Sequence, residues 1–355
     1  MPRCRHRGWL HVVADDGDAA TNSQSFTLRV SDRLDQLVEE LPQPEEQRPG
    51  LVLMLGGGRK DKALRALLRS RTERDRRGRD ADIELTLDPA TAFTERPVMF
   101  ADAHSAPPRR RPSAPPAKGC HRDWEVHVPT DRSTPWGELQ VVPPDLLAAR
   151  LIAPFTDVVC VFLRDFPSPT IALERLSTWI DLGPPSTLPR AVRPHLVLVE
   201  DRATVRKHSA AAVVKRLSRP SPVAFKNVFS GVTTIGLRED SPLGPAAKYL
   251  HLRETILNQL DRVQQSRREA QALFSARHLL AFFHRALDHF GAARREPFDL
   301  IHAARLHDEV PDDLADSLAD FLKDFRSTAS LVALALPLVV TSLLLNHYRP
   351  ETHRK

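Results

Sequence analysis

Cysteine, glycine and aromatic residues are all scarce in this sequence, and each shortage excludes a class of protein. The 355 residues include 3 cysteines and 14 glycines, and phenylalanine, tryptophan and tyrosine together make up 6%. So few cysteines cannot staple a chain of this length, which excludes a disulfide framework and predicts a reducing, intracellular and cytoplasmic setting. The glycine content excludes a collagen-like fibre. No apolar stretch follows Arg3, Arg5 and Arg7, so we expect no cleaved secretory signal.

Positive and negative charges nearly balance over the chain, and the excess of positive charge is concentrated in one stretch. Lysine and arginine number 51 against 45 acidic residues, a formal net charge of +6. Residues 59–79 contain ten basic and three acidic residues, so this stretch alone carries +7. No aromatic residue is interleaved in it, and we therefore expect no specific nucleic-acid partner. Its basic part, residues 69–79, is better interpreted as a solvated loop than as a site for anionic lipid or phosphate.

One group of residues has metal-ligand chemistry. Cys120 and His121 are adjacent, and His127 follows closely. A zinc site needs about four ligands at finger-like spacings, and no second pair lies nearby. The sequence therefore favours a structural role for these side chains, and we predict no bound metal.

The chain divides into three parts by composition. Residues 1–24 are polar and lack periodicity, which predicts a flexible lead-in. Residues 25–240 alternate β-rich runs with amphipathic stretches, and a proline- and arginine-rich insertion interrupts them at about 104–122. Residues 245–349 have helical periodicity. With 41% hydrophobic residues, the chain can form a substantial core, and we expect an α/β domain followed by an α-helical domain.

The middle part predicts an α/β fold with a mostly parallel sheet. The run 51–55 is continuously apolar, as is typical of strands buried on both faces of a parallel sheet. Predicted strands cover residues 51–55, 83–87, 97–101, 157–163, 195–199 and 232–237. Predicted helices cover residues 63–68, 145–152 and 171–180. Strands that alternate with helices in this way favour a layered α/β sheet.

A run of glycines directly after the first of these predicted strands resembles the phosphate-binding loop of a P-loop NTPase of the GTPase type. In that loop, backbone N–H groups and a helix N-terminus surround the phosphates. The candidate nucleotide-binding residues are Gly56, Gly57 and Gly58 in the loop, Lys60 as the phosphate lysine and Asp102 as the acid on the metal side.

The motif is nevertheless incomplete. It requires G-x-x-x-x-G-K-[ST], but Arg59 stands where a glycine should precede the lysine, and Asp61 replaces the hydroxyl that would bind magnesium. The base-reading Asn-Lys-x-Asp is missing after the strand at 195–199. We therefore expect a degenerate, non-hydrolysing domain with weak and magnesium-insensitive nucleotide binding at most, and no other cofactor.

Several further blocks together resemble the region that lies ahead of the catalytic domain in large fungal proteins with a patatin-like phospholipase domain. The resemblance covers roughly residues 25–353. It is carried by residues 51–54 (LVLM), 58–68 (GRKDKALRALL), 149–162 (ARLIAPFTDVVCVF), 192–194 (VRP), 273–279 (LFSARHL), 282–283 (FF), 296–301 (EPFDLI) and 306–310 (LHDEV).

This resemblance implies an accessory region rather than a hydrolase. Patatin-like enzymes use a Ser/Asp dyad with a Gly-x-Ser-x-Gly elbow and an Asp-Gly-Gly/Ala segment, and neither pattern occurs here. The glycines at 56–58 imitate an oxyanion loop, but donors without a nucleophile catalyse no acyl transfer. The chain ends at Lys355, where we expect the relatives to continue. We assign no catalytic residue and expect a patatin-like hydrolase domain, or another protein, as the partner.

The C-terminal part carries three apolar helical stripes and one uncharged stretch. The stripes begin at Tyr249, Leu279 and Leu314, and Ser275 has the chemistry of a helix cap. Residues 327–346 contain no charge, and their length could just span a bilayer. Because Pro337 lies in the middle, we favour a kinked core helix packed against side chains such as Phe283, Leu287 or Phe321.

The sequence thus predicts a non-catalytic accessory or regulatory region. Two alternatives stay open. One is a weak nucleotide-binding switch that works through Lys60 and Asp102. The other is a membrane-associated protein that contacts lipid through residues 327–346 or through the basic run.

Overall fold

The computed structural model describes residues 7–14, 25–69, 82–104, 122–130, 141–201, 210–217, 222–237, 244–304, 314–325 and 327–347. The chain divides into two compact units, residues 1–303 and 304–355. The division therefore falls later than the expected change of domain near residue 245, because the long helices that follow residue 245 pack on the sheet.

The first unit is an α/β layer with a nine-stranded sheet in the order β6-β2-β1-β4-β5-β3-β7-β8-β9. The strands are β1 (Gly8–Ala14), β2 (Ser25–Ser31), β3 (Gly50–Gly56), β4 (Ile83–Leu87), β5 (Val98–His104), β6 (Asp123–Pro129), β7 (Val158–Phe162), β8 (His195–Asp201) and β9 (Gly231–Leu237). The α/β class and the positions of the predicted strands are confirmed.

The sheet is mixed, so the prediction of a mostly parallel sheet is wrong. Neighbouring strands are parallel from β5 through β3, β7 and β8 to β9. They are antiparallel from β6 through β2, β1 and β4 to β5. Most of the antiparallel half is contributed by β1, β2 and β6, for which we made no explicit strand prediction.

Strand β1 also corrects the prediction of a flexible lead-in over residues 1–24. Trp9, Leu10 and Val12 are buried, whereas His11 is half-buried. Strand β1 pairs antiparallel with β2. The apolar residues of this short run are enough to bury one face of a strand, although the surrounding sequence is polar.

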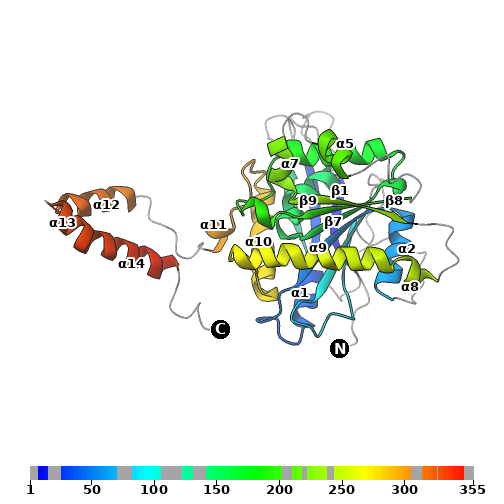
Figure 1. The fold of residues 1–355 in the computed structure, drawn as a ribbon, viewed down its shortest axis with the longest axis horizontal. Helices are drawn as coiled ribbons and strands as arrows, with labels where there is room; N and C mark the ends of the chain where they lie inside the picture. The colour runs from blue at the N-terminus through cyan, green and yellow to red at the C-terminus, as the bar shows by residue number, and fades with distance from the viewer. Residues whose placement is uncertain are drawn as a thin grey trace. The chain divides into compact units, whose positions relative to one another are not determined.

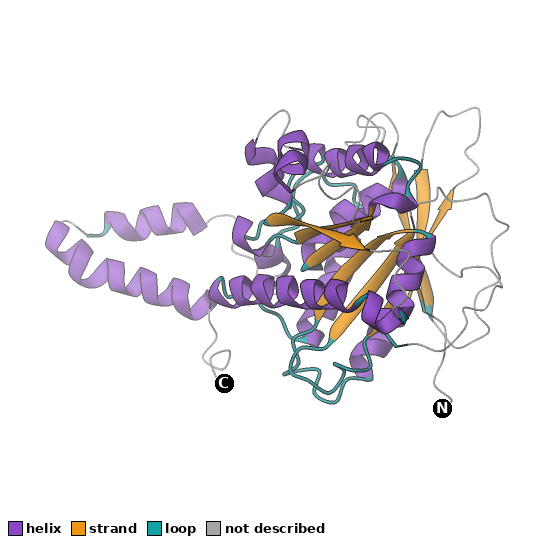
Figure 2. Ribbon diagram, turned by 45° about the vertical axis from the view of Figure 1, so that its right-hand side comes forward, coloured by secondary structure: helices purple, strands orange, loops and turns teal. Residues whose placement is uncertain are grey.

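Helices cover both faces of the sheet (Figures 1 and 2). The helical segments of the first unit are α1 (Arg33–Glu39), α2 (Gly58–Leu67), α4 (Pro143–Leu146), η1 (Leu147–Ile152), η2 (Ala153–Phe155), η3 (Leu163–Asp165), α5 (Pro169–Asp181), η4 (Arg190–Val192), α6 (Ala210–Leu217), α7 (Pro222–Val228), α8 (Pro245–Lys248), α9 (Leu250–Glu269), α10 (Ala276–Gly291) and α11 (Leu300–Ala304), the last of which ends at the boundary. The predicted helix over residues 145–152 is divided between α4 and the π-helical η1.

Alternation along the buried strands builds two hydrophobic clusters, one on each face. In β3, Leu51, Leu53 and Leu55 belong to the cluster that includes α1, α5 and α10. Val52 and Met54 belong to the other cluster, with α2 and α9. Helix α9 crosses this second face and contacts β3, β7 and β8 (Figure 1). The predicted stripe of α9 and the Ser275 cap of α10 are both present.

The second unit contains α12 (Leu314–Lys323), α13 (Thr328–Ser330), η5 (Leu331–Ala335) and α14 (Leu336–His347). The helix predicted from residues 327–346 forms as α13, η5 and α14, and the second unit itself does not bury it; the predicted packing on Phe283 or Leu287 stays a prediction. Leu334 is 57% exposed and Leu338 is 56% exposed. Phe283 packs on Trp9 in the first unit, with a distance of 4.7 Å between ring centroids.

Pro337 accounts for the irregularity of this helix. Its ring lacks an N–H and crowds the carbonyl four residues earlier, at Ala333. The turn before it, η5, is π-helical. Within the part of the chain that the structure describes, no helix is both long and apolar enough to cross a membrane.

Candidate functional site

The candidate residues Gly56, Gly57, Gly58, Lys60 and Asp102 converge at one edge of the sheet. The glycines lie at the end of β3 and the start of α2, and Lys60 is in the first turn of that helix. Asp102 is on β5, directly beside Met54 of β3. Strand β3 lies between β5 and β7, and the strands that follow it in the chain are placed on both sides of it: β4 and β5 on one side, and β7, β8 and β9 on the other. The carboxyl end of such a strand is where ligands bind in open α/β sheets.

The turn from β3 into α2 is short, and one of its glycines is required by geometry. Gly56 has a φ of +153°, a conformation that other residues rarely adopt, and a Cβ atom there would lie 2.8 Å from Asp165 Oδ2. A Cβ atom at Gly58 would meet no atom within 4 Å. Helix α2 begins only two residues after Gly56, so the turn lacks the length of the four-residue spacer in a P-loop.

A carboxylate of the same chain occupies the position that a phosphate would take at the start of α2. Asp165 Oδ2 accepts hydrogen bonds from the backbone N–H groups of Gly57 at 2.7 Å and Lys60 at 2.9 Å. Asp165 Oδ1 accepts a third, from the N–H of Arg59 at 3.0 Å. These donors are among the N–H groups that a helix N-terminus leaves without intrahelical partners. The negative carboxylate also interacts favourably with the positive end of the helix dipole.

Asp165 was not predicted from the sequence. It ends η3, directly after β7, and β7 pairs in parallel with β3. The available signal was its position: Asp165 is an acidic residue shortly after β7, a strand that neighbours the one ending in the glycine run. The sequence does not show that the carboxylate turns back toward α2.

Lys60 and Asp102 are brought together, but they are paired with each other. The side chain of Lys60 is completely buried and that of Asp102 is 1% exposed, and Lys60 Nζ contacts Asp102 Oδ1. Lys60 Nζ also donates to the carbonyl of Ala103 at 2.6 Å and lies 3.9 Å from Asp61 Oδ1. The ammonium is therefore surrounded by anionic and carbonyl oxygens of its own chain.

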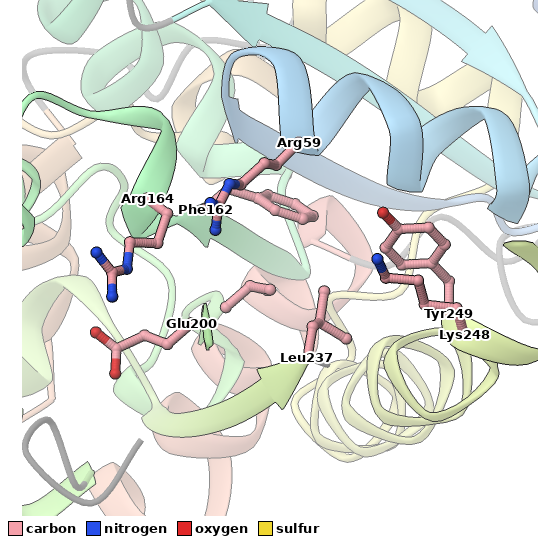
Figure 3. Close-up of a pocket in the computed structure, with 8 residues that line it drawn as sticks. Arg59, Phe162, Arg164, Glu200, Leu237, Lys248 and Tyr249 are labelled. Atoms are coloured by element: carbon pink, nitrogen blue, oxygen red, sulfur yellow. The ribbon is translucent and has the colours of Figure 1, made fainter. Parts of the chain in front are cut away.

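A cleft opens beside this turn, at the carboxyl ends of β7, β8 and β9 (Figure 3). It is open to solvent, and the space that it encloses has a volume of about 20 Å³, enough for about one water molecule. Its lining residues are Arg59, Phe162, Arg164, Val199, Glu200, Leu237, Lys248 and Tyr249. None of these was predicted as a ligand-binding residue.

The structure describes one of the three residues considered as metal ligands. Cys120 and His121 lie outside the described residues, and His127 is part of β6. Among the described residues, no group of three or more histidine, cysteine or acidic side chains is arranged to hold a metal ion. The basic residues 70–79 likewise lie outside the described part of the chain.

No protein-family model matches this chain, and no curated protein matches it. The geometry of the turn at β3 and α2 therefore carries the functional conclusion.

Proposed function

We propose that this chain is a non-catalytic accessory or regulatory domain with the architecture of a degenerate P-loop NTPase. The observation that carries the proposal is Asp165, which accepts the N–H groups that phosphate oxygens would otherwise accept. A phosphate at this turn would have to displace a carboxylate of like charge. In addition, the ammonium of Lys60, which would bind the phosphate, already contacts the carboxylate of Asp102.

The order of elements supports the same proposal. Along the chain, β3 is followed by α2, β4 and β5, and later by β7, α5, β8 and β9. This is the strand–glycine turn–helix order on which the resemblance to GTPase-type domains depends. The chemistry at the turn has changed from binding an external anion to binding an internal one.

The patatin-like resemblance gives the proposed context. We propose that this domain regulates or positions a patatin-like lipid hydrolase of the fungal type, because the blocks that carry the resemblance lie in the region ahead of that catalytic domain. Three of these blocks form much of β3, α2 and the segment from η1 to β7, so the resemblance includes the core of the sheet.

Nucleotide titration tests the proposal most directly. Calorimetry of the full chain with GTP and with ATP, each with and without magnesium, should give no magnesium-dependent binding and no hydrolysis. The chain should also release no fatty acid from phospholipid when compared with a heat-killed control. Magnesium-dependent binding in the micromolar range that Asp102→Asn abolishes would overturn the proposal and favour a nucleotide switch.

A second candidate function is attachment to a lipid surface through α14 and η5. It is favoured by the exposure of Val332, Leu334, Leu336, Leu338 and Val340, each between 44% and 60%. Residues 327–346 carry no charge. Large apolar side chains that face solvent on several sides of a helix indicate that another apolar phase covers them in the working protein.

A further inference from the structure

The uncharged helix formed by α13, η5 and α14 is covered mainly along one row of side chains. In that row Ala335 is completely buried, and Leu331 and Val339 are half-buried. Residues four apart lie above one another on a helix, so the neighbouring rows can be read from the numbering. The large apolar side chains of the two neighbouring rows are each 44–60% exposed: Val332, Leu336 and Val340 on one side, and Leu334 and Leu338 on the other.

The two exposed rows point in different directions. Successive residues of a helix are rotated by roughly 100°, so the two rows lie on opposite flanks of the covered one. The fourth row, opposite the covered one, contains Ala333, Pro337 and Thr341, none of which is charged. A groove on a protein partner would cover one flank, whereas the hydrocarbon of a lipid leaflet can cover both. The exposure on both flanks therefore favours lipid as the covering medium.

Helix α12 has the opposite character. Its outer surface carries Asp316 and Asp320, and Asp324 follows at the same four-residue spacing; all three are exposed. Lys323 Nζ pairs with Asp320 Oδ1 at 2.7 Å. A row of carboxylates enters hydrocarbon only at a large cost in free energy. Within the second unit, α12 therefore belongs on the water side.

The connection between these helices restricts how the uncharged one meets lipid. In Figures 1 and 2, α12 and α14 form the two arms of a hairpin that turns at α13. If α14 crossed a bilayer, the carboxylates of the adjoining arm would be drawn into hydrocarbon. A helix in the plane of the surface can instead turn its exposed rows to lipid while α12 stays in water. Helices of this kind lie about 5–10 Å into the boundary between headgroups and acyl chains.

We propose that the second unit is an in-plane lipid anchor, in which α13, η5 and α14 lie in one leaflet of a phospholipid bilayer and the acidic row of α12 faces water. The proposal rests on the second candidate function, attachment to a lipid surface, and adds the depth and orientation of each helix. Because residues 327–346 carry no charge, the contact needs no charged headgroup, and phosphatidylcholine is a sufficient probe.

Fluorescent labels on single cysteines measure the depth of each side chain. In the full chain, Cys4→Ser and Cys120→Ser remove two native thiols, and Cys160 is kept because it is completely buried. Phosphatidylcholine vesicles carry a nitroxide quencher either near the headgroup end of the acyl chain or near its far end. A nitrobenzoxadiazole label is attached at one exposed position in each variant: Val332→Cys, Val340→Cys, Leu338→Cys or Asp320→Cys.

The three labels on the uncharged helix should shift their emission to the blue and lose intensity with vesicles, more with the shallow quencher than with the deep one. Val332 and Val340 are eight residues apart, about 12 Å along a helix, yet their labels should be quenched equally because the helix lies in the plane. The label at Asp320→Cys should keep the emission of the free chain. Glu174→Cys, at an exposed position on α5, is the matched control and should also be unchanged.

The possible failures separate this proposal from lipid attachment itself. If vesicles change none of the labels, both are overturned. Unequal depths at Val332 and Val340, or quenching at Asp320 by the shallow nitroxide, would overturn the in-plane anchor and leave lipid attachment intact. A blue shift on one flank only, without quenching by either nitroxide, would show that a protein surface covers the helix and would overturn both.

Discussion

Asp165 stabilises the turn between β3 and α2 as an internal substitute for an external anion. Its two carboxylate oxygens accept three backbone N–H groups within 3.0 Å. Such charge-assisted hydrogen bonds are stronger than neutral ones. The carboxylate therefore stabilises the start of α2, and we expect it also to exclude an external anion; one variant can test both effects.

Asp165→Ala should lower the free energy of unfolding by about 1–2 kcal/mol, the range for loss of a helix cap. The N–H groups that Asp165 no longer occupies in this variant should then donate hydrogen bonds to an external anion. Inorganic phosphate should raise the Tm of Asp165→Ala more than chloride of equal ionic strength does, whereas the wild-type chain should show only the general salt effect. Glu174→Ala, which removes an exposed carboxylate on α5, serves as the control. Equal phosphate effects on all three proteins would contradict the substitution of phosphate by Asp165.

His195 should make stability depend on pH. Burial, together with the positive charge of Arg262, lowers the pKa of His195 from 6.5 to about 4. Between these two values the unfolded chain binds a proton at this site and the folded chain does not, so this contribution to stability is complete above pH 6.5 and is lost as the pH falls toward 4.

Replacement of His195 tests this directly. The fall in urea-unfolding free energy between about pH 7 and about pH 5 should be smaller in His195→Gln than in the wild-type chain, because the glutamine does not titrate. The amide can still bond to Thr233, whose Oγ1 lies 2.9 Å from His195 Nε2. The exposed His302 provides the control variant, His302→Gln, which should keep the wild-type slope. A pH dependence that is identical in all three proteins would exclude His195 as its source.

The residues of the turn show what the sequence could and could not predict. The glycine run after an apolar strand marked the turn between β3 and α2, in which Gly56 has a positive φ. The sequence also placed Lys60 and Asp102 on neighbouring elements. Their pairing with each other could not be read from spacing, because it depends on the side-chain geometry of a buried pair. Asp165 lies more than 100 positions from the turn it fills, and no local pattern marks that contact.

At the scale of elements, the ion pair between Arg267 and Asp157 attaches the end of α9 to the sheet. Arg267 Nε lies 2.7 Å from Asp157 Oδ1, and both side chains are buried. The other oxygen of Asp157 accepts the N–H of Leu51 at 3.0 Å. Arg267 also donates to the carbonyl of Thr156 at 3.1 Å. One arginine thus connects α9 to the segment before β7, and through Asp157 to the start of β3.

Arg267→Met should lower the free energy of unfolding by about 3–5 kcal/mol, because it leaves the buried carboxylate of Asp157 without its counter-ion. The double variant Asp157→Asn/Arg267→Met should cost less than the sum of the two single variants, as expected for directly coupled groups. The exposed neighbour Arg268 gives the control Arg268→Met, which should change stability by no more than about 0.5 kcal/mol. Chemical denaturation measures all four variants. Additive losses would mean that the two residues do not stabilise the protein as a pair.

The elements also divide by how far local sequence predicts them. Strands β3, β7 and β8 are recognisable because burial on both faces makes them continuously apolar. Strand β6 also carries a local signal, which we did not use for a prediction: Trp124, Val126 and Val128 alternate with polar residues, as is typical of a strand with one buried face. The mixed character of the sheet follows from β1, β2 and β6, whose pairing depends on contacts between distant segments.

At the scale of the whole molecule, the two units differ in how they bury apolar surface. The first unit has two extensive hydrophobic clusters. In the second unit, no residue of α12 is buried, and the only buried residue of η5 is Ala335. The stretch 327–346 is uncharged and rich in leucine in spite of this exposure. Sequence periodicity predicted the helix correctly, but whether the helix is covered depends on a partner or phase that the sequence does not identify.

If lipid covers this stretch, the chain should bind vesicles through α14 and η5 without needing the first unit to change. The full chain should co-sediment with phosphatidylcholine vesicles, because burial of leucine side chains in hydrocarbon is favourable by about 1.5–3 kcal/mol each. Leu334→Glu/Leu338→Glu should abolish sedimentation, since both side chains are more than half exposed and a charge there opposes burial. The Tm of the first unit should not change, because both substitutions lie in the second compact unit.

Lys323→Glu, on the exposed surface of α12, is the control for added negative charge. The lipid interpretation is refuted if the wild-type chain stays in the supernatant with vesicles. If the chain then associates with itself in a concentration-dependent way, and the double variant does not, a second copy covers the helix.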